Sequence, residues 1–470
     1  MELTRIAESL SPSQIVGDAR VEIEDLAHDT RAVGPGALFF CVRGARFDGH
    51  DLAERAIQAG AAALVVEHPV ASRVPQVVVA DAREAMAAAA ATFFGRPTDE
   101  LEVAGVTGTN GKTTTAFLVY SILEAAGRRP GLIGTVESRV GGEARPAVRT
   151  TPEAIELQRS FREMLDAGDR SCALEATSHG SQLKRLDGVQ FAALAFTNLT
   201  QDHLDLHGTM EAYFEAKRRL FLEGRPPAAI NVGDEWGRRL ADDRPDALTY
   251  GFAEDAELRP EALTGIDLKL KGRFNVENAL AAMATGRLLG VDEQAIARGL
   301  EAVDGVPGRF EAVDEGQPFT VIVDYAHTPD SLENVLTTAR ELTSGRVLCV
   351  FGCGGDRDRE KRPMMGRIAS ELADLAIVTS DNPRSEDPGA IIDEILAGTP
   401  SNTVLQGQME VVPERRDAIG LAVESAEAGD VVVIAGKGHE QGQQFRDRTV
   451  PFDDRDVARE ALRRLRAPTP

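Results

Sequence analysis

The chain has few cysteines and no long apolar run. Four cysteines in 470 residues are too few for a disulfide framework, and their spacing matches no metal site. The N-terminal segment carries Glu2, Arg5 and Glu8 where a secretory signal would be apolar. No apolar run approaches the roughly 20 residues that a membrane-spanning helix needs. We therefore expect a soluble protein of the reducing cytoplasm, with no insertion into a membrane.

Positive charge is also scarce, with 52 Lys and Arg against 75 Asp and Glu and a net charge of −23. Such a surface repels nucleic acid and anionic membranes, so neither is expected as a partner, and an anionic substrate needs a local basic pocket. The 43% hydrophobic and 27% charged residues are typical of a globular protein, and 470 residues are too many for one core. We expect a monomer of several domains.

The most informative segment is Val103–Thr115, where an apolar strand leads into a glycine-rich turn and a helix that begins near Lys112. Backbone N–H groups in such a turn, with the positive end of a helix, bind polyphosphates. Lys112 is placed to reach the terminal phosphates, and the Thr113 hydroxyl to bind Mg²⁺. The segment therefore predicts a nucleoside triphosphate site. Its predicted residues are Gly108, Thr109, Asn110, Gly111, Lys112, Thr113 and Thr114.

The order of apolar runs and helical patterns predicts an α/β fold with three domains. Gly95–Thr98 and Gly305–Gly308 interrupt the pattern, which places the expected domains at 1–95, 96–305 and 306–470. Strands that alternate with helices in the last two blocks are typical of parallel sheets. We expect a smaller N-terminal α/β domain, a central P-loop ATPase domain and a C-terminal Rossmann-like domain. The expected strands are 37–42, 63–66, 77–79, 101–106, 173–175, 192–196, 228–231, 320–323, 346–351, 375–379 and 431–435.

Several residues of the central block are of types that hold metals and nucleotides. Glu175 ends an apolar strand beside the P-loop, which suits a second Mg²⁺ ligand or a water-holding group, although a solvent-exposed strand end is the alternative. His203 lies in a stretch dense in Asn, Asp and His and is a candidate metal ligand. Lys217, taken alone, reads as a solvated helix lysine. Asn275 and Asn278 share a helix face and suit a base or ribose, with capping as the alternative for Asn275.

Four strands of the last block each lead into a polar loop. In open parallel sheets ligands bind beyond the carboxyl ends of the strands, so the four loops predict a second binding surface that faces the nucleotide domain. The loops are Asp324–His327, Gly352–Asp358, Ser380–Arg384 and Gly436–Glu440.

Together these motifs resemble the Mur ligases, the ATP-dependent amide-forming enzymes of peptidoglycan precursor synthesis. The resemblance spans nearly the whole chain, as a UDP-binding, an ATPase and an amino-acid-binding domain. Gly352–Asp358 with Lys361–Pro363 resembles the branch that adds the third residue of the peptide. The activity implied is addition of meso-2,6-diaminopimelate to UDP-N-acetylmuramoyl-L-alanyl-D-glutamate through an acyl phosphate. The motifs are Gly108–Thr114, Asn198–Gly208, Asn275–Asn278, Asp324–His327 and Gly436–Glu440.

The resemblance also implies roles for individual residues. ATP and two Mg²⁺ are the implied cofactors, and CO₂ is implied to carbamylate Lys217, which then binds the second Mg²⁺ with His203. Catalytic roles are implied for Lys112, Glu175, His203, Lys217 and His327, and metal binding for Thr113, Glu175, His203 and carbamylated Lys217. Further ATP contacts are implied for Asn275, Asn278, Arg309 and Asp324. The UDP-substrate set is Thr30, Thr150, Thr151, Thr177 and Arg185.

The uridine end departs from the usual family pattern. Thr30 stands where Ser is usual, and Arg149 stands where Asn often precedes the Thr pair. The loop 45–47 also differs from common nucleotide-loop sequences.

The choice of amino acid can be argued from charge. Diaminopimelate differs from lysine by one distal carboxylate, which a guanidinium neutralises with paired hydrogen bonds. Asp381–Arg384 resembles the diaminopimelate-specific form, with Arg384 as the reading group, although a surface arginine after a turn is the plain alternative. The resemblance adds the other members of the set, which is Arg357, Asp381, Asn382, Pro383, Arg384, Gly436 and Glu440.

Three other functions stay open at this point. Within the ligases, the chain could add lysine, or act on folate. A different class is a P-loop switch or motor ATPase, which would hydrolyse ATP without an amine acceptor and would leave the four C-terminal loops unexplained.

Overall fold

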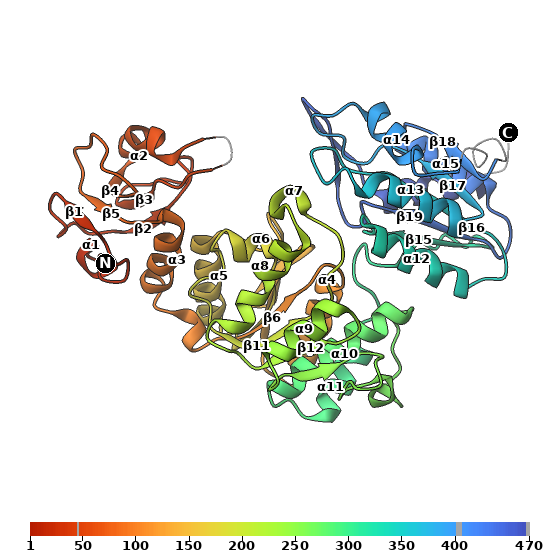
Figure 1. The fold of residues 1–470 in the computed structure, drawn as a ribbon, viewed down its shortest axis with the longest axis horizontal. Helices are drawn as coiled ribbons and strands as arrows, with labels where there is room; N and C mark the ends of the chain where they lie inside the picture. The colour runs from red at the N-terminus through yellow and green to blue at the C-terminus, as the bar shows by residue number, and fades with distance from the viewer. Residues whose placement is uncertain (45–46, 401–406, 467–470) are drawn as a thin grey trace.

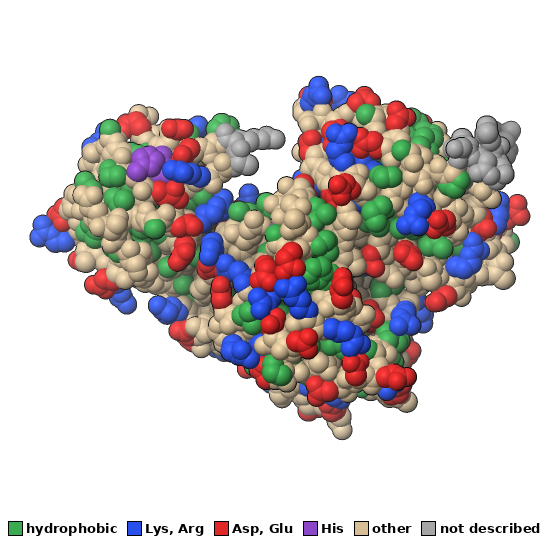
Figure 2. Space-filling model, viewed as in Figure 1, with side chains coloured by type: hydrophobic (Ala, Val, Ile, Leu, Met, Phe, Trp, Pro, Cys, Tyr) green, Lys and Arg blue, Asp and Glu red, His purple; other side chains and the backbone are tan. Residues whose placement is uncertain are grey.

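The computed structural model describes residues 1–44, 47–400 and 407–466. The chain forms three α/β units in sequence order, each around its own sheet (Figure 1). The N-terminal and C-terminal units lie above the central unit in this view, and a wide opening separates them on the surface (Figure 2). The predicted α/β fold is confirmed, whereas the exact domain boundaries stay predictions.

The N-terminal unit has a five-stranded sheet in the order β1-β5-β4-β3-β2. Successive residues of a strand face opposite sides, so Phe40 packs toward α3 (Ala82–Phe93) while Phe39 packs toward α2 (Ala53–Ala59). Asp81 caps α3 by accepting hydrogen bonds from the backbone of Arg83 and Glu84. The strands are β1 (Gln14–Val16), β2 (Asp25–Ala27), β3 (Ala37–Phe40), β4 (Ala61–Val66) and β5 (Gln76–Val78), and α1 (Leu3–Ala7) precedes them.

The central unit has an eight-stranded sheet in the order β13-β12-β11-β6-β10-β7-β8-β9. Its first six strands in this order are parallel, and helices cover both faces because the strand interiors are apolar on both sides. The strands are β6 (Glu102–Thr107), β7 (Pro130–Ile133), β8 (Glu137–Val140), β9 (Glu143–Pro146), β10 (Ser171–Glu175), β11 (Phe191–Phe196), β12 (Ala228–Asn231) and β13 (Leu248–Tyr250).

Two groups of helices enclose this sheet. One face packs against α4 (Lys112–Ala125), α10 (Arg273–Leu288) and α11 (Glu293–Glu301). The other face packs against α5 (Ala154–Ala167), α8 (Met210–Leu222) and α9 (Glu235–Asp243), with the short helices α6 (Ser178–Gln182) and α7 (Leu204–His207) nearby.

The C-terminal unit has a six-stranded sheet in the order β14-β15-β19-β16-β17-β18, parallel except for β14. Its helix α12 (Pro329–Glu341) begins at a capping box formed by Thr328 and Ser331. The strands are β14 (Glu311–Ala312), β15 (Thr320–Asp324), β16 (Val347–Phe351), β17 (Leu375–Val378), β18 (Met409–Val411) and β19 (Val431–Ala435), with a hairpin of β20 (Gly442–Gln444) and β21 (Thr449–Pro451). The other helices are α13 (Lys361–Leu372), α14 (Pro388–Leu396), α15 (Arg415–Ser425) and α16 (Asp454–Arg466).

The expected strands are present with shifts of one or two residues at their ends, and 228–231 and 431–435 match β12 and β19. The sequence analysis missed the antiparallel edge formed by β8 and β9. Most residues of these two strands are partly or fully exposed, so they carry no apolar run or alternation to signal a strand.

Within the described residues, no helix combines the length and apolar character needed to cross a bilayer.

Candidate active site

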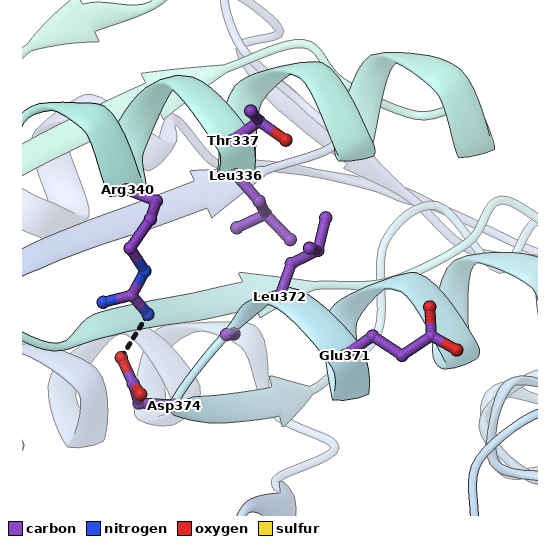
Figure 3. Close-up of a pocket in the computed structure, with 7 residues that line it drawn as sticks. Leu336, Thr337, Arg340, Glu371, Leu372 and Asp374 are labelled. Carbon is purple, nitrogen blue, oxygen red and sulfur yellow. Dashed lines mark hydrogen bonds and ion pairs between the residues drawn. The ribbon is translucent and has the colours of Figure 1, made fainter.

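The carboxyl ends of the central and C-terminal sheets meet around one large cavity of about 700 Å³. Residues of the P-loop, of β10, of α8 and α10, and of the loops after β15 and β16 line it. A second hollow of about 250 Å³ lies between α12 and α13, where Arg340 pairs with Asp374 beside Leu336 and Leu372 (Figure 3). It lies beside the amino end of β17, not at the carboxyl ends of the strands, and holds none of the predicted site residues.

The P-loop connects β6 to α4 as the sequence predicts. Gly108 and Gly111 have φ angles of 150° and 85°. A Cβ on Gly108 would lie 1.9 Å from Thr197 Oγ1, and one on Gly111 would lie 2.2 Å from Asn278 Oδ1, so both positions need glycine. Lys112 Nζ donates to the carbonyl oxygens of Gly108 and Thr109 at 3.1 and 2.7 Å, which holds the ammonium over the loop.

Glu175 is buried beside the first turn of α4, so the exposed strand end considered above is wrong. The Thr113 hydroxyl donates to Glu175 Oε2 at 3.0 Å. Thr135 donates its backbone N–H to Oε1 at 2.7 Å and its hydroxyl to Oε2 at 2.9 Å. The two predicted ligands of the first Mg²⁺ therefore adjoin, and Thr135, which no motif indicated, orients the carboxylate.

Lys217 is 1% exposed, so the solvated helix lysine read from the sequence alone is wrong. Its Nζ donates to Gly108 O at 2.8 Å and lies 4.5 Å from the ring centroid of Tyr213. Burial, with a smaller contribution from the charge of Lys112, lowers the pKa of Lys217 well below its ordinary value. Burial therefore shifts Lys217 toward its neutral amine form.

His203 lines the same cavity, and its Nε2 lies 3.3 Å from Asp202 Oδ2. Its ring packs edge-on against His179 at 4.7 Å between centroids, and burial lowers the pKa of His203 to about 3. No group of three or more His, Cys, Asp or Glu side chains suited to a metal occurs in the described part of the chain. The predicted metal ligands also include the Thr113 hydroxyl and carbamylated Lys217, which are not side chains of these four types.

Residues of the C-terminal unit complete the nucleotide side. Arg309 Nη2 donates to Thr113 Oγ1 at 3.2 Å, and its guanidinium lies 4.3 Å from the ring centroid of Tyr325. Asp324 accepts backbone hydrogen bonds from Phe310 and Ala326, which fixes the loop that follows β15. Asn110 Nδ2 also donates to Asp330 Oδ2 at 2.7 Å across the same boundary.

A buried carboxylate that the sequence analysis did not select lies at this boundary. Asp202 faces His327 Nε2 at 3.8 Å and Lys361 Nζ at 3.7 Å, both from the C-terminal unit. Burial raises the pKa of Asp202, but the neighbouring His203, followed by Lys361 and His327, holds it well below its ordinary range. Asp202 lies in the motif Asn198–Gly208, and Lys361 lies in the motif Lys361–Pro363. These family motifs are the sequence signal that could have indicated both residues.

The asparagine pair is held by its own hydrogen bonds. Asn278 Nδ2 donates to Asn275 Oδ1 at 3.0 Å, and Asn275 Nδ2 donates to Lys271 O at 2.7 Å. Asn278 lines the cavity, and Asn275 supports it from behind this lining. The predicted base or ribose contact therefore suits Asn278 better than Asn275.

Four of the five predicted UDP-substrate residues converge next to Glu175. Thr151 Oγ1 donates to Glu175 O at 2.7 Å and lies 2.9 Å from Thr177 Oγ1, while Arg185 Nη1 donates to Thr151 O at 3.1 Å. The hydroxyl oxygens of Thr150 and Thr135 are 3.0 Å apart. Thr30 is in a half-buried turn after β2 of the N-terminal unit, outside the cavity lining. Residues 45 and 46, part of the atypical loop, lie outside the described residues.

The predicted diaminopimelate residues form a neighbouring cluster. Asn382 Nδ2 and Lys437 Nζ both donate to Glu440 Oε2, at 2.7 and 2.9 Å, which joins the loops after β17 and β19. Arg384 Nη1 donates to Gly355 O at 2.6 Å, which adds the loop after β16. Arg384 is half-buried, and burial followed by the charge of Arg357 lowers its pKa. It is therefore more than a surface arginine after a turn.

The other members of this set lie in the same loops. Asp381 and Pro383 are buried, a Cβ on Gly436 would lie 2.6 Å from Asp381 Oδ2, and Arg357 lines the large cavity.

Comparison with known proteins agrees with this arrangement. Residues 22–94 match the Mur ligase family catalytic domain, 106–286 the Mur ligase middle domain, and 308–438 the Mur ligase glutamate ligase domain. A UDP-N-acetylmuramoyl-L-alanyl-D-glutamate--2,6-diaminopimelate ligase from Solibacter usitatus is 46% identical over 469 residues, covering 95% of this chain and 94% of that protein. The chain belongs to the Mur ligase family.

Other relatives of this Mur ligase carry the same name. The protein from Geobacter metallireducens is 45% identical and covers 99% of both chains. A solved structure with that name aligns with a TM-score of 0.67 and 32% identity over 99% of each chain. The MurF structure from Acinetobacter baumannii, at a TM-score of 0.66 and 18% identity over 98% of each chain, shares the fold.

Proposed function

We propose that this Mur ligase joins meso-2,6-diaminopimelate to UDP-N-acetylmuramoyl-L-alanyl-D-glutamate and cleaves ATP to ADP and phosphate. The observation that carries the proposal is the position of Arg384, whose loop contacts Glu440 through Asn382 and Gly355 through Arg384 itself, beside the ATPase cavity. Relatives that are 40–46% identical over nearly the whole chain are named for this reaction.

In the first step the γ-carboxylate of the donor attacks the γ-phosphorus of ATP. A bond forms between a carboxylate oxygen and phosphorus, the bond to the β-phosphate oxygen breaks, and ADP leaves. Both reactants are anions, so charge neutralisation and alignment provide most of the rate enhancement. Lys112 and Arg309 supply cationic groups at the phosphate end, and the P-loop supplies backbone N–H groups.

In the second step an amine of diaminopimelate attacks the acyl phosphate carbonyl. The C–N bond forms, the C–O bond to phosphate breaks, and the amine loses a proton. Asn382, Arg384 and Glu440 would hold the distal end of the amino acid, so that only its reacting amine points toward the cavity. His327 and Asp324 are proposed to position phosphate and nucleotide.

Two Mg²⁺ ions would be held by Thr113 with Glu175 and by His203 with carbamylated Lys217. Three features of this chain fit them: the hydrogen bond between Thr113 and Glu175, the half-buried His203 that lines the cavity, and the burial of Lys217, which shifts it toward a neutral amine. Only an unprotonated amine reacts with CO₂ to form a carbamate. When bound, the ions would neutralise phosphate charge.

Phosphate release tests this assignment. Purified protein with ATP and Mg²⁺ should release phosphate only when both the UDP-linked dipeptide and meso-diaminopimelate are present, with one tripeptide product per phosphate by mass spectrometry. Turnover with lysine in place of diaminopimelate would support the lysine alternative. Turnover with a pterin and glutamate would support the folate alternative, and hydrolysis without an acceptor would support a switch ATPase.

The cytoplasmic location and the monomeric state stay predictions. Gel filtration of the purified chain, which should elute near its mass of 50.4 kDa, tests the second.

A further inference from the structure

Three arginines surround one buried carboxylate where the N-terminal and central units meet. Glu153 Oε1 accepts hydrogen bonds from Arg149 Nη1 at 3.0 Å and pairs with Arg185 Nη2 at 2.8 Å. Glu153 Oε2 accepts one from Arg83 Nη1 at 3.3 Å. Arg83 comes from α3 of the N-terminal unit, and the other two arginines come from the central unit. We call these four residues the arginine cluster.

The arginine cluster holds more positive charge than Glu153 needs. One guanidinium neutralises one carboxylate, so three around a single carboxylate leave an excess of two positive charges. This excess occurs in a chain with a net charge of −23. Burial, with repulsion from Arg149 and Arg83, lowers the pKa of Arg185, so the fold keeps like charges together at a cost. An additional anion would relieve that repulsion.

The arrangement also leaves donors free. Among the described residues, Arg185 Nε is buried without a hydrogen-bond partner. The Arg149 side chain is 51% exposed, whereas that of Glu153 is only 6% exposed. Glu153 precedes α5, yet its carboxylate makes no capping hydrogen bond and serves the arginines instead.

Two members of the arginine cluster face the reaction cavity. Arg149 and Arg185 line it together with Thr150, Thr151 and Thr177, the residues predicted to hold the dipeptide donor. Basic side chains are also visible on the surface where the N-terminal unit meets the central unit (Figure 2). Since Arg83 belongs to the N-terminal unit, and Arg149 and Arg185 line the cavity that contains the P-loop, the arginine cluster connects the two regions.

We propose that Arg83 and Arg149, with Arg185, form an oxyanion site that binds the anionic donor between its uridine end and its reacting carboxylate. The inference rests on the proposed function and adds Arg83 and Arg149 to the donor contacts. The oxyanion is either the diphosphate or the free α-carboxylate of the glutamyl residue, which present the same charged oxygen atoms to a guanidinium.

Calorimetric binding of UDP-N-acetylmuramoyl-L-alanyl-D-glutamate, without ATP or amino acid, tests the site. Arg149→Ala should weaken binding about ten-fold or more, as expected for loss of a hydrogen bond between charged groups, and Arg149→Lys should retain part of the affinity. Arg83→Ala should also weaken it. Arg145→Ala is the matched control, since Arg145 is 50% exposed, pairs with Glu163 and lies outside the cavity lining. Its affinity should equal that of the wild type.

The outcomes separate the two proposals. If the wild type, Arg149→Ala and Arg83→Ala all bind the donor equally well, the oxyanion site is overturned. The proposed function then still stands. No donor binding by the wild type would overturn both. In a competition arm with UDP alone, weaker binding to Arg149→Ala identifies the diphosphate as the oxyanion, and unchanged UDP binding with weaker donor binding identifies the α-carboxylate.

Discussion

Replacing Arg384 tests how the protein selects its amino acid. The guanidinium makes one hydrogen bond, to Gly355 O at 2.6 Å, and pairs with no carboxylate in the described part of the chain. Most of its five N–H donors are therefore available to a substrate. Arg384 also has a φ of 52°, a conformation that Asn tolerates better than Ala. We therefore specify two variants, Arg384→Ala and Arg384→Asn.

The magnitude follows from the lost contact. Two parallel hydrogen bonds between a guanidinium and a carboxylate contribute about 3 kcal/mol in a half-buried site, which is about 100-fold in kcat/KM. Lysine has no distal carboxylate, so its kcat/KM should not fall. The ratio of kcat/KM for diaminopimelate to that for lysine should therefore decrease by about 100-fold in both variants.

Coupled phosphate release with each amino acid measures this ratio, and thermal unfolding checks that the variants fold. Arg446→Ala is the matched control. Arg446 lies in the β20–β21 hairpin, and its exposed guanidinium donates to Ser385 O. This variant should leave the ratio unchanged. An unchanged ratio in both Arg384 variants would refute the assignment of Arg384 as the reading group.

Three further predictions concern catalysis and stability. Lys217→Ala should abolish ligation, and small carboxylic acids such as formate should restore part of it; if none does so in the phosphate-release assay, the carbamate loses its support. Arg415→Met should lower the free energy of unfolding in urea by about 3–5 kcal/mol, because it strands the fully buried Asp454 that Arg415 binds at 2.7 Å, and a loss below about 1 kcal/mol would contradict this. The hydrogen bond from Arg362 lowers the pKa of Glu386 to about 2 from an ordinary 4.5, so its stabilisation is present above pH 4.5 and is lost as pH falls toward 2. Glu386→Gln should therefore destabilise the protein at pH 7 and have little effect near pH 2, and equal effects at both pH values would be inconsistent with this pKa.

The sequence determined the parts of this protein that depend on neighbouring residues. The P-loop was readable because a buried strand, two glycines that must be glycine and a helix beginning at Lys112 follow one another directly. The parallel sheets were readable because strands such as β12 and β19 are short apolar runs. The family was readable because its motifs occur in order along the whole chain.

Tertiary structure decided what depends on residues far apart in the chain. Lys217 reads as an exposed helix lysine, and only packing against Gly108 and Tyr213 buries its amine and favours the neutral form. The adjacent His203 lowers the pKa of Asp202 most, and Lys361 and His327, which lie more than one hundred positions further along the chain, lower it further. Glu153 meets Arg83 across a domain boundary in the same way. Local patterns specify elements and motifs, but burial and charge pairing arise only when distant segments come together, because both are set by the neighbours that folding supplies.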